Sequence, residues 1–298
     1  MMASPTLRYQ RLLHLVVFIF GFTAILGKLI TLRAEVLVWY RLLIAVAGIG
    51  VYLLLRRQPL RLTVRQLSAT AATGLLIGAH WVLFFSAIKL ANISITLICL
   101  SISPFIVAFI EPLAFGRRVR PYEVIFGVLA VLGLMFIFRI ESGYRTGMVI
   151  ALCATVLSSL FVVINAILVR HHAASLISFY ELIGALVGLS LYLLWMETPA
   201  EWFRLSGADL GWLLALGLLC TAFAYIAAVE VMRILSPYTV MLTVNLEPVY
   251  GIILALLIFG DTEYMSPEFY GGAGIVLLTI LGNALIKQRE SKGPQPGR

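Results

Sequence analysis

The sequence is organised as ten long apolar segments, and the short stretches between them hold most of its charged residues. A helix that crosses the hydrocarbon core of a bilayer needs about 20 predominantly apolar residues. The strands of a membrane β-barrel would instead alternate in hydropathy over about ten residues, whereas these segments are continuously apolar. The chain is therefore predicted to be an all-α polytopic membrane protein with ten transmembrane helices. The predicted spans cover residues 12–32, 35–55, 67–89, 92–115, 121–139, 147–169, 175–196, 209–231, 237–259 and 267–286.

The low share of charged residues excludes the soluble classes of protein. Only 12% of the 298 residues are charged and 61% are apolar, whereas soluble domains average about 25% charged and 45–50% apolar residues. Ten spans of about 20 residues each leave connections that are too short for a second domain. The three cysteines lack the spacing of metal ligands, so no metal site is predicted.

Basic residues gather at one set of span ends. The loops that would share a side with the N-terminus hold most of the 22 Lys and Arg residues, including Arg56, Arg57, Arg61 and Arg65. Because cytoplasmic loops are enriched in Lys and Arg, we predict a multi-pass protein of a bacterial-type inner (plasma) membrane with both termini in the cytoplasm. Basic loops that face anionic lipid account for the net charge of +8, so no nucleic-acid partner is predicted.

The chain repeats itself at about half its length. Residues 39–44 resemble residues 179–184, which lie 140 positions later, and Pro104 and Pro248 lie 144 positions apart. A similar offset that persists through Tyr, Pro and Gly positions is typical of an internal duplication.

Each half holds five predicted spans, an odd number, so the second half must enter the bilayer in the opposite orientation. We predict a first five-helix repeat over residues 1–140, a second, inverted repeat over residues 141–290 and a polar C-terminal tail over residues 291–298. Inverted repeats are the structural basis of alternating access in secondary transporters, which bind their substrate near the midplane between the halves. The duplication therefore predicts a transporter.

Several short motifs resemble the EamA-type transporters of the drug/metabolite transporter superfamily. They are Phe20-Gly21-Phe22 in the first span, Arg41 in the second, Lys89-Leu90-Ala91-Asn92 at the end of the third, and Pro104 and Pro248 with the Phe-Gly pairs that follow them. The resemblance covers nearly the whole chain. It implies a central cavity built from both repeats and the export of amino acids or other small metabolites. The family often has an acidic residue after the Phe-Gly pair, where this chain has Arg117 in the first repeat and Asp261 in the second.

Glu247 lies about ten residues into the ninth span and hence near the membrane midplane. A charge at this depth is costly to insert, so it usually faces a cavity or a partner. Pro248 follows directly and removes a backbone donor, and Asn245 is two residues away. We predict that Glu247 binds a substrate amine, and it is the candidate for proton coupling. The alternative is burial against a basic group without transport chemistry.

His80 and Trp81 lie about 13 residues into the third span and are predicted to contact substrate through an imidazole and an indole ring. Adjacent residues diverge by about 100° on a helix, so only one of the two is expected to face the cavity fully. The alternative for His80 is a structural hydrogen bond.

Arg41 and Glu181 occupy equivalent positions of the repeat, but inversion places them near opposite membrane faces, so they are not expected to pair. Arg41 could attract an anionic group or lock a gate, and Glu181 could mirror it on the inner side. The alternative for each is snorkelling or a local partner.

The other substrate-binding candidates are polar residues within the spans, namely Tyr40, Tyr180, Tyr225, Asn245 and Ser103. Each tyrosine could instead pack with its hydroxyl group satisfied. Ser103 is the first-repeat counterpart of Glu247, so the two repeats differ chemically at the centre of the membrane. Such an asymmetry suits a substrate with two unlike ends.

Catalytic patterns are absent from the sequence. It has no Walker loop, no paired aspartates, no Gly-x-Ser-x-Gly motif and no Cys or His set for zinc, so neither enzyme activity nor a cofactor is predicted. The predicted function is secondary active export of small metabolites, with amino acids as the favoured class, by a monomer or homodimer. The alternatives left open are a channel or uniporter for small solutes and, less favoured, an intramembrane enzyme that uses Glu247 and His80 as acid and base.

Overall fold

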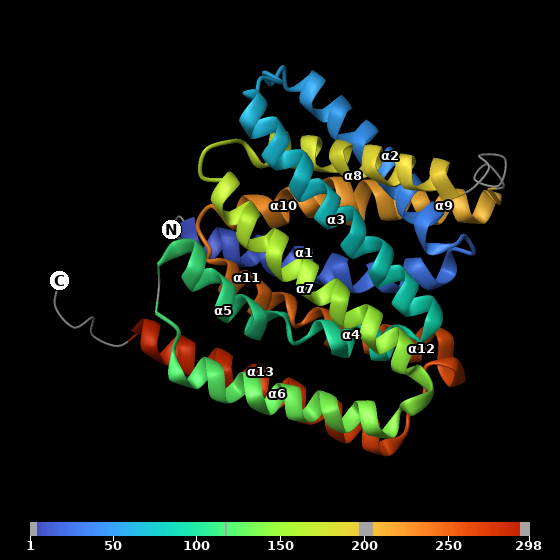
Figure 1. The fold of residues 1–298 in the computed structure, drawn as a ribbon, viewed down its shortest axis with the longest axis vertical. Helices are drawn as coiled ribbons and strands as arrows, with labels where there is room; N and C mark the ends of the chain where they lie inside the picture. Colours follow the sequence, from blue (N-terminus) through green and yellow to red (C-terminus); the bar gives the residue numbers. More distant parts are fainter. Residues whose placement is uncertain (1–4, 117, 197–204, 293–298) are drawn as a thin grey trace.

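The described chain is an all-α bundle, as predicted. The structure is a computed structural model that describes residues 5–116, 118–196 and 205–292. Within these ranges the chain forms helices and no strands, and most of the helices lie side by side (Figure 1). Arg117 and residues 293–298 of the predicted tail lie outside the described residues.

The elements follow the predicted order of spans. The first half contributes α1 (Pro5–Leu29), α2 (Ala34–Leu55), α3 (Val64–Leu90), α4 (Ile93–Leu100), α5 (Ser103–Phe115) and α6 (Pro121–Ile140). The second half contributes η1 (Ser142–Tyr144), α7 (Arg145–Leu168), α8 (Ala174–Met196), α9 (Gly207–Leu214), the π-helix η3 (Ala215–Phe223), α10 (Ala224–Val231), α11 (Pro237–Val244), α12 (Glu247–Phe259), η4 (Gly260–Thr262) and α13 (Pro267–Lys292). The last helices of the two halves, α6 and α13, pack against each other at one edge of the bundle (Figure 1).

Nine segments of the described chain are long and apolar enough to cross a membrane, and the tenth predicted span lies within α13. Helix ends differ from the predicted span ends because helices continue past the apolar core. α1 begins at Pro5, so Arg8 lies in its first turn. α3 begins at Val64, where Thr63 and Gln66 form a reciprocal capping box.

The fourth and ninth predicted spans are each broken into two half-helices. α4 ends at Leu100 and α11 ends at Val244, and a proline follows four residues after each end, Pro104 in α5 and Pro248 in α12. A proline ring clashes with the carbonyl group four residues earlier and lacks an N–H group, so neither helix can continue unbroken. The two prolines that mark the repeat in the sequence therefore also place the breaks.

The first half-helix of each broken span is capped by a buried carboxylate from the other half of the chain. Glu263 accepts hydrogen bonds from the backbone N–H groups of Ile93 and Ser94 at the start of α4, at 3.2 Å each. Glu111 accepts one from the N–H of Tyr238 at the start of α11, at 3.0 Å. Ser94 and Tyr238 lie 144 positions apart, the same offset as the two prolines. Carboxylates at different positions of the two halves thus satisfy equivalent backbone donors, which the apolar surroundings leave without water.

Charged contacts close one end of the bundle. We name the end where α1 begins the N-terminal end and the opposite end the distal end. At the distal end Lys28 Nζ lies 2.6 Å from Glu263 Oε1, and Asp209 accepts hydrogen bonds from the N–H and hydroxyl groups of Thr31, both at 2.8 Å. The distal end is therefore held by an ion pair and by a cap on the loop between α1 and α2.

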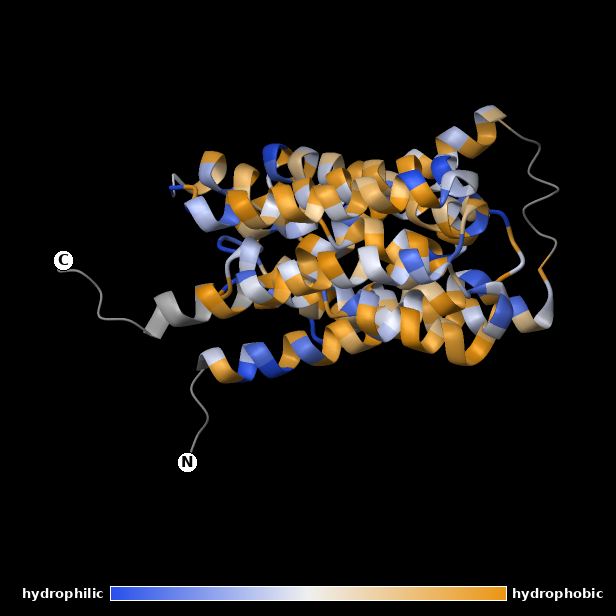
Figure 2. Cartoon of the chain, turned by 90° about the horizontal axis from the view of Figure 1, so that it is seen from below, coloured by the Kyte–Doolittle hydropathy of each residue, from blue (hydrophilic) through white to orange (hydrophobic). Residues whose placement is uncertain are grey.

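Figure 2 shows hydrophobic residues along the flanks of the helices, as expected for contact with lipid.

We expect Glu263→Gln to destabilise the protein. The amide loses the Lys28 ion pair and places an NH₂ group against the backbone donors of α4, which costs about 2 kcal/mol. Thermal unfolding of purified protein in detergent should give a lower Tm. Glu268→Gln, the same change at an exposed residue of α13, should leave the Tm unchanged. Equal Tm values for the two variants would contradict the capping role of Glu263.

Candidate functional site

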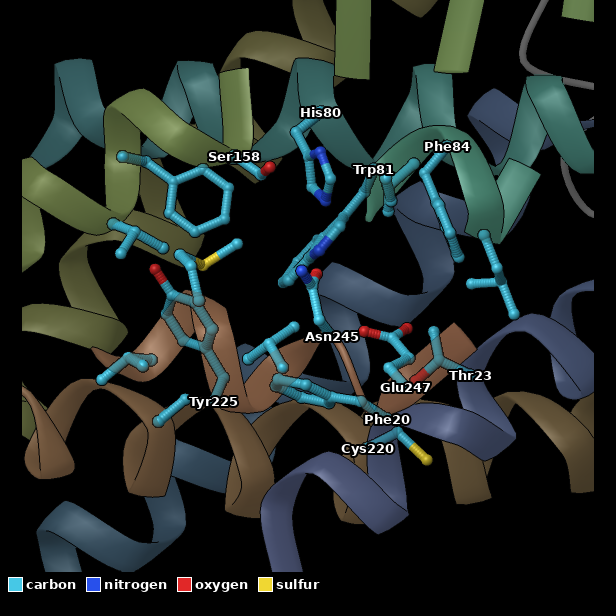
Figure 3. Close-up of a pocket in the computed structure, with 18 of the residues that line it drawn as sticks. Phe20, Thr23, His80, Trp81, Phe84, Ser158, Cys220, Tyr225, Asn245 and Glu247 are labelled. Atoms are coloured by element: carbon cyan, nitrogen blue, oxygen red, sulfur yellow. The ribbon is translucent and has the colours of Figure 1, made fainter. Parts of the chain in front are cut away.

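A cavity of about 110 Å³ lies inside the bundle beside the two helix breaks. Its walls come from both halves of the chain and are mainly apolar. Figure 3 shows the side chains of Trp81, Asn245 and Glu247 directed into this space. The lining residues are Phe20, Thr23, Arg41, His80, Trp81, Phe84, Leu97, Leu100, Ser158, Phe161, Val162, Cys220, Tyr225, Ala228, Val229, Met232, Val240, Met241, Val244, Asn245, Glu247 and Pro248.

Arg41 supplies the cation of the cavity. α2 carries this side chain into the interior, where it is only 2% exposed. Its Nε donates to Thr221 Oγ1 at 2.6 Å, and its guanidinium carbon lies 3.9 Å from the centroid of the Trp81 ring. Nη1 is buried and has no hydrogen-bond partner within the described ranges. A buried guanidinium that is fixed by stacking and keeps an unused donor is suited to bind an anionic group.

Glu247 supplies the anion. It is the first residue of α12, so the N-terminal end of that helix stabilises its carboxylate. The side chain is buried and lines the cavity (Figure 3). The carboxylate interacts electrostatically with the Arg41 guanidinium. One cation and one anion therefore face the same apolar space, and burial makes each depend on a partner of opposite charge.

His80 forms part of the wall and is oriented by a backbone contact. Its Nδ1 lies 2.8 Å from the carbonyl oxygen of Ala154, which can only accept, so Nδ1 carries the proton and Nε2 is left for another partner. The Phe161 ring packs edge-on against the imidazole, with centroids 5.4 Å apart. Both His80 and Trp81 line the cavity, although only one was expected to face it fully. Both rings are large enough to reach the space from adjoining faces of α3.

Asn245 joins the two helix breaks. Its Nδ2 donates to the carbonyl oxygen of Ser101 at 2.8 Å, and the two residues lie 144 positions apart. Ser101 follows the end of α4 and Asn245 follows the end of α11. The contact therefore links equivalent points of the two halves at the wall of the cavity, and it satisfies a carbonyl group that the break in the first half frees.

Tyr225 separates the cavity from a buried polar cluster. Its ring lines the cavity and packs edge-on against Trp81, with centroids 5.9 Å apart. Its hydroxyl group donates to Glu181 Oε2 at 2.8 Å and accepts from Asn165 Nδ2 at 2.9 Å. Glu181 is fully buried and does not line the cavity. Its partners come from α7 and α10, so it and Arg41 do not pair with each other, as expected.

Three other predicted site residues lie away from the cavity. The Tyr180 hydroxyl group donates to the carbonyl oxygen of Leu60 at 2.8 Å, and Tyr40 packs edge-on against Trp39 with centroids 5.1 Å apart. Ser103 is buried with its Oγ 2.8 Å from Ser159 Oγ. Depth in the membrane selected these residues, but depth does not determine which way a side chain points around its helix.

The eighth span contains the π-helix η3, which was not predicted from the sequence. The Thr221 hydroxyl group donates to the carbonyl oxygen of Leu216, five residues earlier, and it also accepts the hydrogen bond from Arg41. π-helical turns occur frequently at functional sites. The continuously apolar sequence of this span carries no signal for such a turn.

Comparisons with known proteins agree with this architecture. A family model described as the EamA-like transporter family matches residues 10–139 and again residues 145–285. A solved structure, titled only as the crystal structure of a protein, is similar with a TM-score of 0.71 at 16% sequence identity, over 96% of this chain and 99% of that chain. At that identity the likeness shows the fold alone. No curated protein sequence matches the chain.

We expect Asn245→Ala to lower stability by about 1–2 kcal/mol, because it leaves the buried Ser101 carbonyl group without its donor. Thr243→Ala is the matched control, since the Thr243 hydroxyl group donates to Thr239 O within α11. Thermal unfolding in detergent should show a larger fall in Tm for Asn245→Ala. A fall no larger than that of the control would mean that the link between the breaks contributes nothing to stability.

Proposed function

The chain belongs to the EamA-like transporter family and is therefore a membrane transporter of small solutes, and we propose that it exports small metabolites, amino acids foremost, by alternating access. Family membership favours transport over enzyme activity. The substrate class, the direction and the mechanism go beyond family membership, and features of the cavity and of the two ends of the bundle support them.

The observation that carries the proposal is the pair of unlike charges in one apolar cavity. Arg41 has a buried Nη1 donor without a partner within the described ranges, which suits a substrate carboxylate. Glu247 lines the same cavity and suits a substrate ammonium group. A zwitterion would bring both counter-charges at once, whereas a ligand with one charge would leave one buried protein charge without a direct partner. The apolar walls suit an amphipathic molecule.

The neighbouring residues would orient the substrate. Trp81 holds the Arg41 guanidinium by stacking, and His80 has its Nε2 left for a hydrogen bond. Asn245 and Tyr225 complete the polar part of the wall. The proposed substrate contacts are therefore Arg41, Glu247, Trp81, His80, Asn245 and Tyr225. Four other candidates do not line the cavity, namely Tyr40, Tyr180, Glu181 and Ser103.

Access from the N-terminal end would fit export. The cavity wall includes Met232, Val240 and Met241, which lie next to the loop between α10 and α11 at that end, while Lys28, Glu263 and Asp209 tie the distal end together. The basic loops favour the N-terminal end as the cytoplasmic one. In the proposed cycle, substrate enters from the cytoplasm, and it leaves when the distal contacts open and the N-terminal end of the cavity closes.

Proton coupling through Glu247 is a separate proposal. A carboxylate that releases a substrate ammonium group can bind a proton in its place, so substrate and proton would occupy the site in turn. Proteoliposomes that contain Glu247→Gln would then have lost the dependence of transport on pH. If the variant transports with the pH profile of the wild type, coupling through Glu247 is wrong, although the transporter class would stand.

The transport proposal is tested by counterflow in proteoliposomes with radiolabelled amino acids from the standard twenty. Substrate inside the vesicles should accelerate uptake from outside, as alternating access requires and a passive channel does not. Recovery of a chemically altered substrate would instead indicate an enzyme. If no amino acid and no mixture of small metabolites gave counterflow, the transport proposal would be wrong.

We expect Glu247→Gln to reduce amino-acid counterflow about tenfold or more, because a hydrogen-bonded charged contact is worth about 1.5–3 kcal/mol. Glu268→Gln, an exposed site with the same chemical change, should transport like the wild type. Size-exclusion profiles and Tm values would establish that both variants fold. Wild-type counterflow in the Glu247→Gln variant would remove Glu247 from the substrate site.

A further inference from the structure

A second buried carboxyl group, Glu181 on α8, lies behind the wall of the cavity. Its side chain is fully buried. Oε2 accepts the hydrogen bond from the Tyr225 hydroxyl group at 2.8 Å, whereas Oε1 is buried without a hydrogen-bond partner among the described residues. Burying an ionised carboxylate is costly unless cations or several donors compensate its charge. The partners of this carboxyl group are the Tyr225 hydroxyl group and the Asn165 amide, and neither carries a positive charge.

Other buried oxygens near Glu181 also lack a hydrogen-bond partner among the described residues. Asn165 interacts with the Glu181 carboxyl group and donates to the Tyr225 hydroxyl group, but its own Oδ1 is buried without a partner in the described part of the chain. Ser178, one turn earlier on α8, has a buried hydroxyl oxygen that is equally unpaired there. A proton bound at the Glu181 carboxyl group would remove its charge and supply one further donor to this cluster.

The charged groups around the cluster do not neutralise Glu181. The helices packed on α8 are α2, α3 and α10, together with the Asn165 side chain from α7. Tyr225 of α10 is the titratable group that contacts Glu181. Arg41 of α2 and His80 of α3 face the cavity instead, and Glu230 of α10 bonds to Arg233 and Tyr9 at the N-terminal end. Glu247 differs from Glu181 in this respect, because it interacts electrostatically with Arg41.

The eighth span connects this cluster to the substrate site. Thr221 and Tyr225 lie four residues apart on it, so they share one side of the helix. Thr221 holds the Arg41 guanidinium, and Tyr225 holds the Glu181 carboxyl group. Arg41 and Glu181 occupy equivalent positions of the two halves. The eighth span, through Thr221 in the π-helix and Tyr225 in α10, therefore joins the residue suited to a substrate carboxylate and the buried acid. Movement of one of them would strain the contact of the other.

We propose that Glu181 is a proton-binding site coupled to transport, reached from the cavity through the Tyr225 hydroxyl group. When substrate is absent from the cavity, the Tyr225 hydroxyl group passes its proton to Oε2 and takes up another from the cavity, so the carboxyl group becomes neutral. The reverse transfer returns the proton to the cavity when Arg41 and the eighth span adjust to bound substrate. This inference rests on the proposed transport function, and it adds a second protonation site, outside the cavity, to the one proposed at Glu247.

The test uses full-length protein in proteoliposomes and the amino acid that gives the strongest counterflow with the wild type. We expect an imposed pH gradient to drive accumulation by the wild type. Glu181→Gln should lose this accumulation but keep counterflow without a gradient, because the variant leaves the cavity lining intact. Tyr225→Phe should weaken the accumulation and shift its pH profile, since it removes the hydroxyl link without removing the acid.

The outcomes separate this inference from the proposed function. Absence of counterflow in the wild type would contradict transport itself. Normal counterflow with gradient-driven accumulation that survives Glu181→Gln would overturn the proton site alone. The proton site at Glu181 would also be overturned if Glu247→Gln lost gradient-driven accumulation under conditions in which Glu181→Gln retained it. Accumulation that is driven by a sodium gradient and lost in Glu181→Gln would also overturn it, because the cluster would then bind a metal cation.

Discussion

The apolar surroundings of a membrane protein make every buried polar group depend on a partner inside the chain, and this constraint explains the features at the centre of the molecule. Pro104 and Pro248 break two spans, and the breaks free carbonyl groups that need donors. The Asn245 amide meets one of these needs by donating to Ser101. At the ends of the bundle, Glu263 and Glu111 cap the two half-helices that the breaks create. The capped residues Ser94 and Tyr238 lie at equivalent positions of the two halves, and so do Ser101 and Asn245.

The same constraint makes the unlike charges in the cavity functionally informative. Arg41 and Glu247 sit where a charge is costly, and each would gain from a ligand group of opposite sign. The repeat positions of the two residues explain the asymmetry: the counterpart of Glu247 is the neutral Ser103, and the counterpart of Arg41 is the acidic Glu181. Duplication supplied the scaffold, and divergence of these positions gave the cavity two different ends. The eighth span connects the two counterparts, because Thr221 in its π-helix accepts a hydrogen bond from Arg41 and Tyr225 in α10 donates one to Glu181.

Much of this fold could be predicted because its signals are strong and local. Apolar length identifies the spans, and proline at equivalent positions marks the breaks. Depth within a span also selected Arg41, His80, Trp81 and Glu247, all of which line the cavity. Depth failed for Tyr40 and Tyr180, since an apolar helix has little amphipathic pattern to show which side faces inward. The capping of α4 by Glu263 depends on residues 169 positions apart, and the π-helical turn changes hydrogen bonding without changing hydropathy. Contacts of these kinds appear only once the chain is folded.

The central claim is that one cavity recognises two opposite charges on the same small molecule. The most direct measurement is the ligand-induced rise in Tm of the detergent-purified protein, with the amino acid of the standard twenty that gives the largest rise compared with its deaminated and decarboxylated analogues. A ligand that binds the folded state raises its stability with the logarithm of concentration over Kd. We expect each analogue to bind about tenfold or more weakly than the amino acid. In Arg41→Ala the amino acid should bind no more tightly than its decarboxylated analogue, and in Glu247→Gln no more tightly than its deaminated analogue. Equal binding of the amino acid and both analogues would contradict the central claim.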